Sequence, residues 1–123
     1  MKWKLTNGSE KKEPLFSQNE IGVLIDLGST KATNDLVLPM VDFILKKAPV
    51  TLLIQKENTP SATVYISTSD RYNFLIKNAY GIGYTGEGSR GLETLLMTLN
   101  VPSEAIKTVF NSNSDGYIQL ETL

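Results

Sequence analysis

The spacing of apolar and polar positions changes several times along the chain. The first residues, Met1-Lys2-Trp3-Lys4-Leu5, alternate with period two, which predicts a strand over 1–5 with one buried face. Two β-branched apolar runs joined by a short polar loop predict a hairpin over 50–68. We expect further strands over 72–77 and 117–123. The apolar positions of 72–77 also fit one face of a helix, but the strand is preferred.

Helical spacing marks other parts of the chain. Ser17–Glu20 has the spacing of a capping box, which predicts a helix over 18–27 that ends at Gly28. The same stretch also fits a buried strand over 22–27, because Val23–Ile25 is apolar and branched. Apolar stripes predict three more helices, over 35–47, 91–99 and 104–110.

Helices therefore alternate with strands that are linked by hairpins. This order is typical of the α+β class rather than of a parallel α/β sheet. We expect a single α+β domain over 1–123, with a mainly antiparallel sheet of four or five strands and three or four helices.

Composition narrows the possible functions. The chain of 123 residues has no cysteine and no histidine, which excludes thiol catalysis, Ser-His-Asp chemistry and Cys/His zinc sites. We therefore expect a protein that is not an enzyme and needs no cofactor. Twelve basic residues against 13 acidic ones exclude general nucleic-acid binding. No apolar run approaches the ~20 residues of a membrane span, and the start lacks a signal-peptide core, so a cytoplasmic protein is expected.

Glycine, arginine and tyrosine gather between residues 71 and 91. The loop expected over 81–91 can present several backbone amides at one point, and the helix after it would favour an anion there. Arg90 offers a bidentate phosphate donor, and Tyr84 offers a ring for stacking. Ser89 is the expected N-cap. The predicted ligand-binding residues are Arg71, Gly83, Tyr84, Gly86, Gly88, Ser89 and Arg90.

These residues suggest a binding protein that sequesters or senses a small phosphorylated, nucleotide-like ligand. A second copy of the chain would help to enclose such a ligand, so a homo-oligomer is possible. Two features oppose the hypothesis: Glu87 brings a negative charge, and glycine clusters are more often turns. The GxGxxG match at 81–86 is no Rossmann signature, because the expected helix begins too late.

Two local resemblances to known segments add little to the functional prediction. The segment from Phe74 to Leu95 is similar to strand–GYxGxG–helix segments of small bacterial and phage proteins, a resemblance that implies no activity. Residues 104–118 resemble the first helix and loop of an EF-hand, with Asn111, Asn113 and Asp115 at ligand positions. The twelfth loop position is Thr122 instead of a bidentate glutamate. A polar turn is therefore preferred, and no metal site is predicted.

An alternative function is a protein-interaction module, such as an inhibitor or immunity protein that blocks its partner. It would use the glycine-rich loop or the edge of the hairpin at Ser61–Thr68, since tyrosine and arginine are enriched at such contacts.

Overall fold

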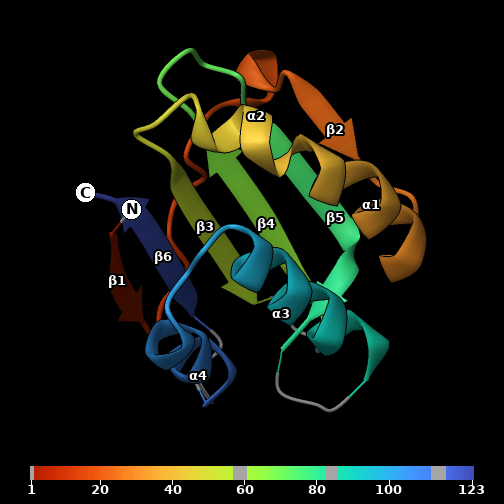
Figure 1. The fold of residues 1–123 in the computed structure, drawn as a ribbon, viewed down its shortest axis with the longest axis vertical. Helices are drawn as coiled ribbons and strands as arrows, with labels where there is room; N and C mark the ends of the chain where they lie inside the picture. The colour runs from red at the N-terminus through yellow and green to blue at the C-terminus, as the bar shows by residue number, and fades with distance from the viewer. Residues whose placement is uncertain (1, 57–60, 83–85, 112–115) are drawn as a thin grey trace.

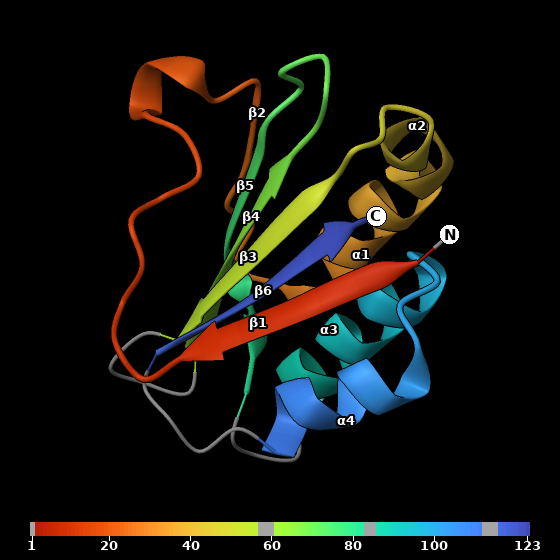
Figure 2. The same ribbon diagram turned by 90° about the vertical axis from the view of Figure 1, so that its left-hand side faces the viewer.

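The computed structural model describes residues 2–56, 61–82, 86–111 and 116–123. They form a six-stranded sheet in the order β1-β6-β3-β4-β5-β2, with the α-helices on one face (Figures 1 and 2). The strands are β1 (Trp3–Gly8), β2 (Val23–Ile25), β3 (Thr51–Lys56), β4 (Ser61–Ser67), β5 (Phe74–Gly81) and β6 (Tyr117–Thr122). Neighbouring strands are antiparallel except β2, which lies parallel to β5. The expected α+β domain with a mainly antiparallel sheet is confirmed.

The helices are α1 (Thr30–Val37), α2 (Val41–Leu45), α3 (Glu87–Thr98) and α4 (Ser103–Asn111). A 3-10 turn, η2 (Leu38–Met40), joins α1 to α2, so the helical stretch predicted over 35–47 is confirmed but begins earlier. Ser29 explains the earlier start, because its Oγ accepts a hydrogen bond from the Ala32 N–H at 3.1 Å. No helix within the described ranges is long and apolar enough to cross a membrane.

The core lies between the helices and the facing side of the sheet. Alternate strand residues point into it, as period-two patterning requires. The main contributors are Leu52, Ile54, Val64, Ile66, Phe74 and Ile76 from the strands and Val37, Ile44, Leu92, Leu95, Leu96 and Val109 from the helices. Burial of each such side chain contributes about 1.5–3 kcal/mol, so this layer holds the helices on the sheet.

The helix predicted over 18–27 is wrong. The capping box at Ser17 forms, with Ser17 N–H donating to Glu20 Oε1 at 2.9 Å, but only the 3-10 turn η1 (Gln18–Glu20) follows it. The chain then becomes extended, and the N–H groups of Gly22 and Val23 both donate to the Asn73 carbonyl oxygen at 2.9 Å. Pairing with β5 outweighs the local helix signal, so the alternative of a strand is correct in type, but β2 is shorter than the expected 22–27 and Leu24 in its middle is exposed.

Residues 9–22, which include η1, run along the face of the sheet opposite the α-helices (Figure 2). Lys12 fastens this segment to the sheet: its N–H donates to Gln55 Oε1 at 3.1 Å, and its carbonyl oxygen accepts from Gln55 Nε2 at 2.6 Å. Lys12 Nζ also donates to Gln119 Oε1 at 2.6 Å. The segment thereby connects β1, at one edge of the sheet, with β2 at the other.

Candidate functional site

The glycine-rich segment forms less of a loop than the sequence predicts. Helix α3 begins at Glu87 with Gly86 as its N-cap, so the assignment of Ser89 as N-cap is wrong. Gly88 and Ser89 are buried in the first turn, and Ser89 Oγ donates to the Gly81 carbonyl oxygen at 3.2 Å. Ser89 thereby connects the first turn of α3 to the end of β5. Gly83 and Tyr84 lie outside the described residues.

The two arginines of the predicted site do not meet. Arg71 precedes β5, whereas Arg90 lies beyond its other end. A strand of this length spans about 25 Å at ~3.3 Å per residue. Arg71 instead lies near η1, where its positive charge adds to the Ser17 hydrogen bonds that lower the pKa of Glu20. The expectation that Arg71 and Arg90 serve one ligand is therefore corrected.

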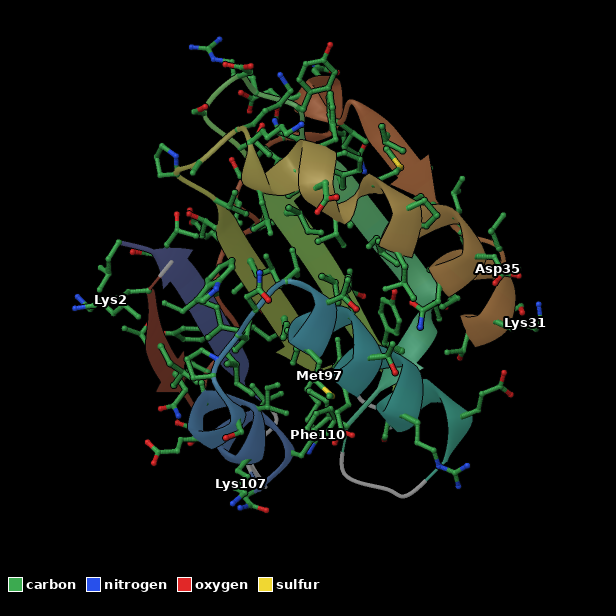
Figure 3. The ribbon with its side chains drawn as sticks, viewed as in Figure 1. Lys2, Lys31, Asp35, Met97, Lys107 and Phe110 are labelled. Carbon is green, nitrogen blue, oxygen red and sulfur yellow. The ribbon has the colours of Figure 1, made fainter. Side chains whose placement is uncertain are left out.

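Arg90 lines a shallow groove between α1 and α3. The groove has a volume of about 270 Å³ and is lined by Thr30, Lys31, Asn34, Asp35, Glu87, Arg90, Gly91 and Thr94. Its two cations face two carboxylates, so its formal charge is zero. Lys31 Nζ lies 2.7 Å from Asp35 Oδ2 at the exposed rim (Figure 3), and this hydrogen bond raises the pKa of Lys31.

A buried polar junction supports the groove. Tyr80 Oη donates to Asn34 Oδ1 at 2.6 Å, and Asn34 Nδ2 donates to the Gly91 carbonyl oxygen at 3.1 Å. Burial raises the pKa of Tyr80 far above its usual value, so its hydroxyl remains a neutral donor. Thr30 Oγ1 donates to the Ala79 carbonyl oxygen. Three elements, α1, β5 and α3, thus meet through side chains that are already satisfied, and among the described residues of the lining Arg90 and Glu87 are the groups available to a ligand.

A second group of side chains, which sequence reasoning missed, lies where α2 meets the turn before β5. We call Phe43, Lys47, Asp70 and Tyr72 the aromatic–lysine cluster. The two rings lie edge to face, with centroids 5.3 Å apart and planes at 86°. Lys47 Nζ lies 4.8 Å from each ring centroid and 2.6 Å from Asp70 Oδ2. Lys47 and Phe43 are only four residues apart, but Asp70 and Tyr72 join them from more than 20 residues further along the chain, so no local pattern signals the whole cluster.

Both rings remain accessible although their positions are fixed. Phe43 is 40% exposed and Tyr72 is 47% exposed. The Ser69 N–H donates to the Lys47 carbonyl oxygen at 2.9 Å, which further holds the turn against α2. The arrangement presents two rings and a cation at the surface in one defined geometry.

The predicted interaction edge at Ser61–Thr68 is wrong. Strand β4 pairs with β3 on one side and β5 on the other, so its backbone has no free edge.

The first EF-hand position, Asn111, ends α4, while Asn113 and Asp115 lie outside the described residues. Thr122, at the twelfth position, is in β6, where its Oγ1 accepts from the Val50 N–H at 2.8 Å. The structure describes no cluster of three His, Cys, Asp or Glu residues suited to a metal ion.

Comparisons with models of protein families, with curated proteins and with solved structures find no match for this chain.

Proposed function

We propose that the chain is a non-enzymatic protein-interaction module, in the manner of an inhibitor or immunity protein, and that the aromatic–lysine cluster is its contact surface. The observation that carries the proposal is the fixed exposure of Phe43 and Tyr72 around Lys47. Aromatic residues dominate binding energy at protein interfaces. Because the rings are already held in place, binding would restrict few additional rotamers.

The surrounding surface supports the same proposal. Leu36 is also large, apolar and exposed. It lies on α1, which η2 joins directly to α2 (Figure 1). Exposed apolar side chains on adjoining elements favour an interaction surface. Lys46 and Arg71 are exposed beside the cluster, so a partner with an apolar patch bordered by carboxylates fits best.

The double variant Phe43→Ala/Tyr72→Ala is expected to abolish recovery of a stoichiometric partner from host extract. Loss of two interface aromatics weakens typical complexes by several kcal/mol. Met97→Ala is the matched control, because Met97 is 60% exposed on the outer surface of α3, away from the cluster (Figure 3). Recovery is measured by quantitative affinity capture, with folding checked by circular dichroism. Equal recovery by both variants, or no stoichiometric partner for the wild type, would contradict the proposal.

One observation favours a second candidate, the nucleotide-like ligand. Gly86, the N-cap of α3, supplies no side-chain cap, and the positive end of the helix dipole lies beside the exposed Arg90, which favours an anion there. A nucleotide at 100 times its Kd is expected to raise the melting temperature by several degrees. Arg90→Ala should remove this shift, while Arg71→Ala should preserve it, because Arg71 lies at the opposite end of β5. No shift with any nucleotide, or one that survives Arg90→Ala, would refute this candidate.

A further inference from the structure

A different pocket lies on the face of the sheet opposite the helices. It has a volume of about 310 Å³ and is lined by Pro14, Phe16, Ser17, Gln18, Ile21, Thr63, Tyr65, Leu75 and Lys77. We call it the sheet-face pocket. Its volume is at the lower end of the range for small-molecule sites, roughly 300–1,000 Å³, so its occupant must be small.

The floor and roof of the sheet-face pocket are apolar and aromatic. Tyr65 and Leu75 are direct neighbours across β4 and β5 and form the floor. Phe16 forms part of the roof, where it is only 8% exposed and packs edge to face on Tyr65, with centroids 5.7 Å apart and planes at 69°. Two aromatic side chains in contact at a steep angle favour a flat ring packed beside them.

The roof is held at both ends. On one side, Lys12 is bonded to Gln55 and Gln119 of the sheet. On the other, Ser17 N–H and Oγ both donate to Glu20 Oε1, at 2.9 and 3.0 Å, and Asn73 Nδ2 donates to the Glu20 carbonyl oxygen at 2.9 Å. The pocket is therefore formed before a ligand arrives, as small-molecule sites usually are.

The charge of the pocket lining indicates which polar group the ligand carries. Lys77 is the charged residue of the lining, and it lies two positions beyond Leu75 on the same face of β5. The nearby Glu20 carboxylate is already bonded to Ser17, and those bonds lower its pKa, so it remains an anion directed at the turn. A lysine ammonium at the end of a flexible stem suits one compact anion. Ser17, Gln18 and Thr63 add polar groups to the same lining.

We propose that the sheet-face pocket binds a small planar aromatic carboxylate, with the ring against Phe16 and Tyr65 and the carboxylate at Lys77. This inference goes beyond the proposed partner-protein contact, because it concerns another face of the molecule and another class of ligand. It requires neither the aromatic–lysine cluster nor Arg90.

Indole-3-acetate and its neutral counterpart indole-3-acetamide are the probes for the test. Titration followed by amide NMR is expected to shift the signals of Phe16, Tyr65 and Leu75, with the acid bound more tightly than the amide. Lys77→Met retains the apolar stem and removes the charge, so the Kd of the acid should rise about tenfold while that of the amide changes little. Lys107→Met, on α4 in the helical layer (Figure 3), is the matched control and should bind like the wild type.

Three results would overturn the inference. They are no shift at millimolar probe, shifts confined to the helical face, and equal affinity of Lys77→Met and wild type for the acid. The Phe43→Ala/Tyr72→Ala variant should bind indole-3-acetate normally, so failure of the partner-protein proposal is distinguishable from failure of this one.

Discussion

Replacing Gly116 by alanine is expected to lower the free energy of unfolding by about 3 kcal/mol or more. A Cβ at this position would lie 1.7 Å from the carbonyl oxygen of Gly8 and 2.6 Å from its carbonyl carbon. The backbones of Gly8 and Gly116 cannot easily move apart, because both are held by strand hydrogen bonds. Gly8 pairs with Tyr117 at the end of the β1–β6 ladder, and the Gly116 carbonyl oxygen accepts from the Lys56 N–H at 3.2 Å. The clash must therefore separate β1 from β6 at this end or strain β3.

Trp3 provides the measurement for this variant. It is the only tryptophan of the chain, and it lies on β1, packed against the core. Denaturant unfolding followed by its fluorescence should show a lower midpoint. Gly28→Ala is the control, because Gly28 has a φ of +68° but nothing within 4 Å of an added Cβ. Its left-handed backbone should make alanine unfavourable by about 1–2 kcal/mol. If Gly116→Ala loses no more stability than Gly28→Ala, the backbones of Gly116 and Gly8 do not lie as close together as the structure describes.

Gly91→Ala is expected to lower the free energy of unfolding by about 2 kcal/mol. Helix propensity alone would give the opposite sign, because alanine is better than glycine inside a helix by about 1 kcal/mol. The steric contact outweighs helix propensity and sets the sign of the change in stability, because an added Cβ would lie 2.2 Å from Thr30 Cγ2 and 3.3 Å from Asn34 Nδ2. The substitution would push α3 away from α1 and disturb the bond from Asn34 to the Gly91 carbonyl oxygen.

Thr30→Ser tests the cause of that loss. Serine lacks the Cγ2 methyl group but retains the hydroxyl that donates to the Ala79 carbonyl oxygen. In a double-mutant cycle, Thr30→Ser/Gly91→Ala should recover most of the stability lost by Gly91→Ala, measured as the shift in denaturation midpoint at constant m-value. Strictly additive effects would show that α1 and α3 do not meet at this pair.

Periodicity predicts the parts of the fold that local sequence controls. The β3–β4 hairpin, β5, β6 and the helices were expected near their observed positions, because alternating and 3.6-residue patterns reflect burial directly. The prediction failed over 18–27, where a real capping box precedes a strand. Only the partner strand β5, far along the chain, makes the extended backbone of Val23 favourable.

The candidate sites were less predictable for a related reason. Arg71 and Arg90 are close in sequence, but an eight-residue strand separates them. The aromatic–lysine cluster joins α2 to the turn before β5, and the sheet-face pocket joins a polar N-terminal segment to two central strands. Composition can identify unusual residues, but it does not indicate which of them meet across the fold.

The path of residues 3–25 determines the order in which the molecule can be assembled. This stretch supplies both edges of the sheet: β1 pairs with β6, Trp3 lying opposite Thr122, and β2 pairs with β5. During synthesis β6 leaves the ribosome after β1, and β5 leaves it after β2. The central β3–β4 hairpin can form early, whereas β1 has no partner until β6 has been made. Such long-range pairing is characteristic of slowly folding chains, so closure of the β1–β6 edge is expected to be the final step of folding.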